Sequence, residues 1–152
     1  MEIDRSAPVL ARSVIQIASD PETVWATLTD LSGWPRWKPA IRSMRFDGRL
    51  EPGARFTWKA GRTTIRSTLR EIDPPSAITW TGSTLGIRAV DTYRLLLCDG
   101  RTEVVQEESW SGLLPRLARS RLRSTLRSSL DEGLQSLKAE AERRTAGGRT
   151  TG

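Results

Sequence analysis

The alternation of apolar and polar residues changes twice along the chain and divides it into three stretches. Val14–Ile17 is short and rich in β-branched residues, which predicts a strand. Asp20 and Pro21 suit a helix cap and a first helical turn, and apolar residues then recur at helical spacing as far as Leu31. Residues 34–39 predict a second short helical segment. The first stretch is therefore a strand followed by two adjacent short helices.

Period-two alternation dominates the middle of the chain, where turn-forming Asp, Pro and Gly residues interrupt it. The clearest hairpin signal is Asp99-Gly100. Six strands fit between the breaks, at residues 41–46, 54–59, 62–72, 76–83, 86–98 and 102–111. This succession of strands and short turns predicts an antiparallel meander.

One face of this predicted sheet is richer in apolar side chains than the other. The positions expected to point inward are Phe56, Trp58, Ile65, Ser67, Leu69, Ile78, Trp80, Ile87, Ala89, Asp91, Tyr93, Val104, Gln106, Glu108 and Trp110. The positions expected to face solvent are Arg66, Arg70, Thr79, Arg88 and Arg94.

Beyond Gly112, leucine and alanine recur every three or four residues from Leu114 to Ala141, which predicts one long amphipathic helix. A break in this helix is expected near Ser120. The sequence predicts one α+β domain over residues 1–144, with the helix stripe buried against one sheet face. Residues 145–152 have nothing to bury and predict a disordered tail.

Composition favours a soluble cytoplasmic protein. Hydrophobic residues make up 37% of the 152 residues and charged residues 28%, and no apolar run approaches the roughly 18 residues of a membrane span. The acidic N-terminus does not resemble a secretory signal. We therefore expect no stable membrane insertion and either a monomer or a homodimer.

The chain contains no histidine and one cysteine, Cys98. An internal disulfide, Ser-His-Asp and Cys-His catalysis, and mixed Cys/His zinc sites are thereby excluded. Any chemistry must use carboxylates, Tyr, Lys, Arg or bound water. We expect no metal and no cofactor.

Several local sequence patterns accompany this order of elements. They are Asp20-Pro21-Glu22-Thr23-Val24-Trp25, Trp34-Pro35-Arg36-Trp37-Lys38-Pro39, Ile72-Asp73-Pro74-Pro75 before Ile78-Thr79-Trp80, and Glu107-Glu108-Ser109-Trp110-Ser111-Gly112 before the terminal helix. With them, residues 14–143 resemble the SRPBCC (START/Bet v 1-like) superfamily, and within it the bacterial polyketide cyclase/dehydrase and lipid-transport group. The resemblance implies a helix-grip fold, in which a seven-stranded curved antiparallel sheet, two short helices and a long C-terminal helix enclose a cavity.

The six tryptophans suit a pocket that holds a flat or greasy ligand, such as a polyketide, lipid or isoprenoid. The candidate ligand-binding residues are Phe56, Trp58, Ser67, Trp80, Ala89, Gln106, Trp110, Leu122 and Leu126. The alternative is that the tryptophans only fill the core. We expect Trp25 in the core, and Trp34 and Trp37 as a structural plug beside the cavity mouth.

If Asp99-Gly100 forms a two-residue turn, Asp91 lies opposite Glu108 and Tyr93 opposite Gln106 on the inward face. Burial and mutual repulsion would then raise at least one carboxyl pKa. The alternatives are a neutralising arginine or a register that exposes the pair. The resemblance to cyclases implies that Asp91, Glu108 and Tyr93 are the catalytic candidates.

Three functions stay open: a ligand carrier, a polyketide cyclase or dehydratase, and a protein-interaction module or cochaperone. The basic cluster Arg116, Arg119, Arg121, Arg123 and Arg127 indicates a solvated helix face, or else an anionic ligand, membrane or nucleic acid. Because the sheet tryptophans are expected inside, no basic and aromatic nucleic-acid surface is evident. We therefore expect a small hydrophobic ligand and no nucleic acid as partner.

Overall fold

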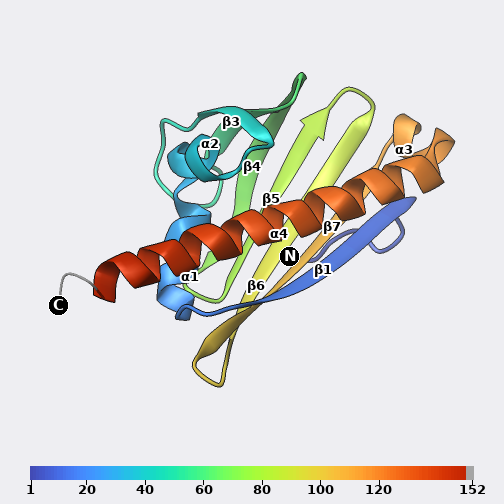
Figure 1. Cartoon of the computed structure of the whole chain (residues 1–152). Helices are drawn as coiled ribbons and strands as arrows, with labels where there is room; N and C mark the ends of the chain where they lie inside the picture. Colours follow the sequence, from blue (N-terminus) through green and yellow to red (C-terminus); the bar gives the residue numbers. More distant parts are fainter. Residues whose placement is uncertain (150–152) are drawn as a thin grey trace.

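The computed structural model describes residues 1–149, in which seven strands form one antiparallel sheet of order β1-β7-β6-β5-β4-β3-β2 (Figure 1). The strands are β1 Val9–Ile17, β2 Ile41–Arg45, β3 Arg55–Ala60, β4 Thr63–Asp73, β5 Ala77–Thr84, β6 Ile87–Cys98 and β7 Arg101–Ser111. The helices are α1 Pro21–Thr29, a 3₁₀ turn at Leu31–Gly33, α2 Trp34–Trp37, α3 Leu113–Leu117 and α4 Arg119–Arg149.

Helix α4 lies across one face of the curved sheet and packs against β1 and α1 (Figure 1). Its buried stripe is Leu126, Leu130, Leu134, Leu137 and Ala141, each at most 3% exposed. Since these residues recur at helical spacing, one side of α4 is buried and the other is exposed to solvent. The helix-grip architecture predicted from the sequence is confirmed.

All six strands predicted in the middle of the chain are present, and the two short helices precede them. The Asp20 carboxylate accepts a hydrogen bond of 2.7 Å from the Thr23 N–H and caps α1, as its position predicted. Strand β1 begins earlier than expected, at Val9, because it pairs with β7 along its whole length. The break before α4 falls at Ala118, next to the predicted position.

The outer face of the sheet is only partly exposed to solvent, because the N-terminal segment crosses it. The amino group of Met1 pairs with Glu71 of β4, and the Asp4 N–H donates to Ser109 Oγ of β7 at 3.0 Å. Ile3, within this segment, is only 6% exposed. Thr79 was predicted to face solvent, but it is buried. It does lie on the outer face of the sheet, as predicted, and the N-terminal segment covers that face.

The end of the chain also differs from the prediction of a disordered tail over 145–152. Helix α4 continues to Arg149, and the Ser19 and Thr145 hydroxyls share a hydrogen bond of 2.7 Å. The preceding residue, Arg144, pairs with Asp30 at 3.3 Å. These contacts with the segments flanking α1 hold residues that have little apolar surface to bury. The remaining predicted tail, 150–152, lies outside the described residues.

Candidate functional site

A cavity of about 690 Å³ lies between the sheet and α4. Small inward residues leave this space open: Gly82 on β5, Ala89 on β6 and Gly133 on α4 all line it. A β-carbon at Gly82 would come within 3.1 Å of Ser67 Oγ, so the strands approach closely there. Thr63, Thr125 and Ser129 line the cavity and are also exposed, which places its opening between α4 and the β3–β4 turn.

Aromatic rings form much of the cavity wall. Trp34 of α2 sits at the centre of a cluster, with ring centroids 5.9 Å from Trp58 and 5.6 Å from Trp80. Trp80 in turn contacts the tilted ring of Tyr93, with the ring centroids 5.2 Å apart. Two indole N–H groups are satisfied, since Trp34 donates to the Leu28 carbonyl at 2.9 Å and Trp58 to Ser67 Oγ at 3.1 Å. The rings are thus held in fixed orientations around an open space.

Most of the candidate ligand-binding residues reach this wall. Those that line the cavity are Trp58, Ser67, Trp80, Ala89, Gln106, Trp110 and Leu126. Two do not. Phe56 is covered by the rings of Trp34 and Trp80, and Leu122 packs with Val9 and Leu130 in a separate small cluster. Phe56 points to the inner face of its strand and Leu122 lies on the apolar side of its helix, as the sequence indicated. Neighbouring side chains nevertheless separate both from the open volume.

Of the tryptophans outside the sheet, Trp25 lies where it was expected and Trp34 does not. Trp25 is a core residue, as predicted. Trp34 was expected as a plug beside the cavity mouth, but it is fully buried and contributes directly to the cavity wall. Trp37 packs against the core, and its indole nitrogen is buried without a hydrogen-bond partner among residues 1–149.

The three catalytic candidates line the cavity together. Asp91 of β6 lies directly opposite Glu108 of β7, and Tyr93 lies opposite Gln106, which is the predicted register. The Asp99-Gly100 turn supplies it, with both residues at positive φ, 50° and 76°. None of the described arginines lines the cavity. The neutralising arginine considered from the sequence is therefore not found beside the carboxyl pair.

Hydrogen bonds join the two carboxyl groups to each other and to their neighbours. Asp91 and Glu108 share a hydrogen bond. The Gln106 amide donates to both Asp91 oxygens, at 3.1 and 3.2 Å, and the Trp110 indole donates to Glu108. The other side of the Gln106 amide, its Oε1, is buried and has no partner among the described residues.

Burial sets the protonation of this pair. Desolvation, followed by the negative charge of Glu108, raises the pKa of Asp91 well above its ordinary value. Desolvation also raises the pKa of Glu108, although hydrogen bonds from Asp91 and Trp110 oppose the shift. Burial likewise raises the pKa of Tyr93, which therefore stays a neutral phenol. A raised pKa favours the protonated form, so this pair keeps a proton to higher pH than ordinary carboxyl groups do.

Lys38 completes the polar cluster, and the sequence analysis did not identify it. It lines the cavity, and its ammonium lies 4.4 Å from the Trp34 ring centroid and 5.9 Å from that of Trp37. Burial lowers its pKa, while the charges of Asp91 and Glu108 act in the opposite direction. Its Nζ has neither a hydrogen bond nor an ion pair within residues 1–149. The available signal was the position of this lysine directly after Trp37 and before Pro39.

The raised pKa of Asp91 predicts how stability depends on pH. A carboxyl group that keeps its proton in the folded state stabilises the fold fully below its unfolded pKa, and this contribution is lost as pH rises toward the folded pKa. We expect the wild type to lose stability above about pH 4, at about 1.4 kcal/mol per unit of pKa difference. Asp91→Asn should flatten this decline, because an amide mimics the protonated carboxyl. Urea unfolding across a pH series measures it.

Asp47→Asn is the matched control, because the Asp47 carboxylate is exposed and paired only with exposed Arg45. This variant should follow the wild-type pH dependence. Parallel stability curves for the wild type and Asp91→Asn would show that the carboxyl pair takes up no proton on folding.

A curved antiparallel sheet that grips a long terminal helix over an internal cavity defines the helix-grip class of START/Bet v 1-like proteins. The chain belongs to the family described as polyketide cyclase / dehydrase and lipid transport, whose model matches residues 8–142. No curated protein matches the sequence significantly.

Solved structures share the fold at low sequence identity. A hypothetical protein of Helicobacter pylori is 14% identical with a TM-score of 0.82, over 91% of both chains. The Zhui aromatase/cyclase of a Streptomyces species is 20% identical with a TM-score of 0.76, over 90% of this chain and 94% of that one. A START superfamily protein of Mycobacterium smegmatis is 13% identical with a TM-score of 0.75, over 88% and 97%.

Residues 1–149 contain no group of three or more Cys, Asp or Glu side chains placed to hold a metal ion. Within the same residues, no helix has the length and apolar character needed to cross a membrane.

Proposed function

We propose that this protein binds a small, largely apolar molecule that carries at least one oxygen function. The ligand occupies the cavity between the sheet and α4, with its flat or greasy part against Trp34, Trp58 and Trp80. Its oxygen lies near Lys38 and the Asp91–Glu108 pair. A planar polyketide, a lipid or an isoprenoid fits this description, and the family description is compatible with each.

One observation carries this proposal: a 690 Å³ space walled by aromatic rings contains a polar cluster with unused hydrogen-bonding groups. Ligand pockets of roughly 300–1,000 Å³ commonly combine an apolar lining with a few polar groups that orient the ligand. Here the unused groups are the Lys38 ammonium and Gln106 Oε1. Aromatic walls around a cavity of this size are better suited to contact with an apolar ligand than with water.

Native mass spectrometry of the protein as purified tests the proposal. We expect a co-purifying small molecule, or binding of a hydroxylated anthraquinone or a fatty acid with quenching of tryptophan fluorescence. The adduct should be lost in Trp80→Ala and in Trp110→Ala. If no adduct forms and none of these probes binds to a correctly folded protein, the cavity is not a ligand site.

Lys38 should recognise the oxygen of the ligand. A hydrogen bond to a charged group contributes about 1.5–3 kcal/mol, which corresponds to at least about tenfold in affinity. We expect 2-naphthol to bind the wild type more tightly than naphthalene, and Lys38→Met to abolish that advantage while keeping the affinity for naphthalene. Fluorescence titration with the two compounds measures the difference.

The control for Lys38→Met is Arg36→Met, two residues earlier in α2, since Arg36 is exposed and pairs with Asp30 outside the cavity. It should retain the preference for 2-naphthol. An equal loss of affinity for both compounds in Lys38→Met would instead indicate a change in cavity shape.

A second candidate function, cyclisation or dehydration of a polyketide chain, is favoured by the carboxyl pair. Glu108 as the ionised member would remove a proton from carbon beside a ketone. The carbanion would attack a second ketone carbon, and the protonated Asp91 would supply a proton to the resulting alkoxide. Tyr93, as a neutral phenol, would donate a hydrogen bond to a ketone oxygen.

Paired substitutions separate the two functions. Asp91→Asn and Glu108→Gln should abolish the cyclisation of a linear poly-β-ketone substrate, followed by absorbance of the aromatic product, while both variants still bind 2-naphthol. If neither substitution lowers turnover, the carboxyl pair only orients a ligand.

A further inference from the structure

One end of the molecule combines exposed leucines with arginines, and neither group takes part in the cavity. Four leucines there are strongly exposed: Leu85 at 93%, Leu113 at 68%, Leu114 at 42% and Leu117 at 76%. Leu85 stands on the β5–β6 turn, and the other three belong to α3. Large apolar side chains this exposed, and clustered, mark an interaction surface.

Two glycines bring these chain segments together. The Leu114 N–H donates to the Gly86 carbonyl at 3.2 Å, so α3 lies directly on the β5–β6 turn. Gly112 has φ 117°, and a β-carbon there would come within 2.6 Å of the Gly86 oxygen. The leucines of both segments therefore form one surface, although they lie far apart in sequence.

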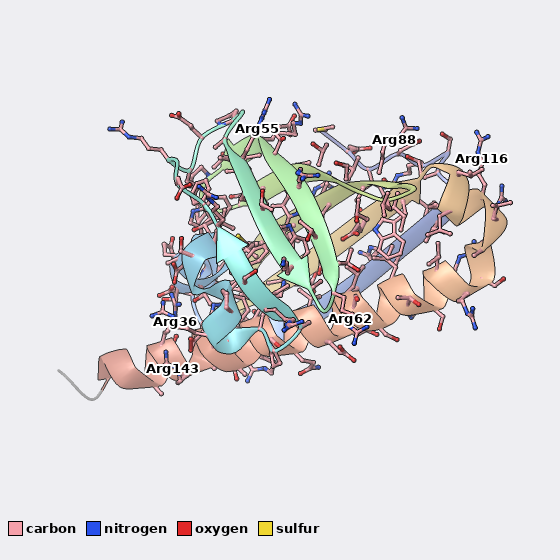
Figure 2. All side chains as sticks on the ribbon, turned by 90° about the horizontal axis from the view of Figure 1, so that it is seen from above. Arg36, Arg55, Arg62, Arg88, Arg116 and Arg143 are labelled. Carbon is pink, nitrogen blue, oxygen red and sulfur yellow. The ribbon has the colours of Figure 1, made fainter. Side chains whose placement is uncertain are left out.

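Arginines surround the leucines without any acidic residue in the same segments. Residues 74–90 and 109–130 contain no Asp or Glu. Their six arginines are exposed and have no ion pair among the described residues: Arg88, Arg116, Arg119, Arg121, Arg123 and Arg127. Figure 2 shows Arg88 and Arg116 at the same end, remote from Arg36 and Arg143. Six equals the formal net charge of the whole chain, so the remaining basic and acidic side chains balance.

We propose that this leucine–arginine tip docks onto an anionic lipid bilayer. Leucines enter the acyl boundary while the surrounding guanidinium groups bind lipid phosphates, a combination typical of peripheral membrane attachment. A second copy of the chain is disfavoured as occupant because the two arginine clusters would repel each other. A nucleic acid would leave the leucines unused. Docking does not depend on what the cavity binds.

Sedimentation of the full chain with lipid vesicles tests the docking. We expect it to sediment with vesicles of equal parts phosphatidylcholine and phosphatidylglycerol, and to stay in solution with phosphatidylcholine alone. Leu85→Ser combined with Leu117→Ser should lower the bound fraction at least about tenfold, as should Arg119→Gln combined with Arg123→Gln. All four side chains are exposed, so these variants should fold; circular dichroism checks this.

Matched controls use similar residues elsewhere on the surface. Leu96 and Leu97, 51% and 67% exposed, lie toward the opposite end of β6, and serine at both should leave vesicle binding unchanged. Arg49→Gln combined with Arg55→Gln is the control for the arginines. Three results would overturn the proposal: no sedimentation with the anionic vesicles, dependence on the arginines but not the leucines, or binding of a DNA duplex in place of vesicles.

Discussion

Trp34→Ala will lower the free energy of unfolding by about 3–5 kcal/mol, the usual cost of truncating a buried tryptophan to alanine. Trp34 is fully buried, its ring contacts those of Phe56, Trp58 and Trp80, and its indole nitrogen donates to Leu28 at the end of α1. Removal therefore leaves a void between α2 and the sheet. Urea unfolding followed by circular dichroism measures the loss.

Two further variants divide this effect into its parts. Trp34→Phe keeps an aromatic ring but loses the hydrogen bond to Leu28, and should cost less than Trp34→Ala. Trp37→Ala, on the same helix, should also cost less, because Trp37 is only partly buried and its indole nitrogen has no partner to lose. If Trp34→Ala cost under about 1 kcal/mol, the range of an ordinary substitution, the aromatic cluster would not be what holds α2 on the sheet.

Ala89→Phe will lower the affinity for 2-naphthol at least about tenfold, because its ring enters the space that the ligand needs. Ala89 lines the cavity near the start of β6, next to Gly82 of β5 in the sheet. Overpacking a filled core typically costs about 1–3 kcal/mol of stability. Here the new side chain projects into open volume, so we expect the fold to tolerate it. Fluorescence titration and thermal unfolding measure the two effects.

Val90→Phe is the matched control, because it adds a similar ring one residue along the same strand. Successive side chains of a strand point to opposite faces, so residue 90 faces away from the cavity. Affinity for 2-naphthol should be unchanged. Retention of wild-type affinity in Ala89→Phe would place the ligand outside the cavity.

Local periodicity determined most of the fold. Strand and helix periods differ, so the sequence located all six middle strands and the terminal helix without tertiary information. A two-residue turn at Asp99-Gly100 likewise set the pairing of Asp91 with Glu108, because hairpin register follows from turn length. The inward positions of Trp58, Trp80 and Trp110 follow from the two-residue period of their own strands.

Tertiary packing decided which inward residues meet open space and which outward ones are covered. Phe56 and Trp58 share a strand face, yet only Trp58 reaches the cavity, because the Trp34 and Trp80 rings cover Phe56. Thr79 is buried by an N-terminal segment that pairs with distant strands. Lys38 joins the carboxyl pair because α2 docks beside the cavity. Contacts between residues far apart in the sequence produce no periodic pattern along the chain, so only the three-dimensional structure reveals them.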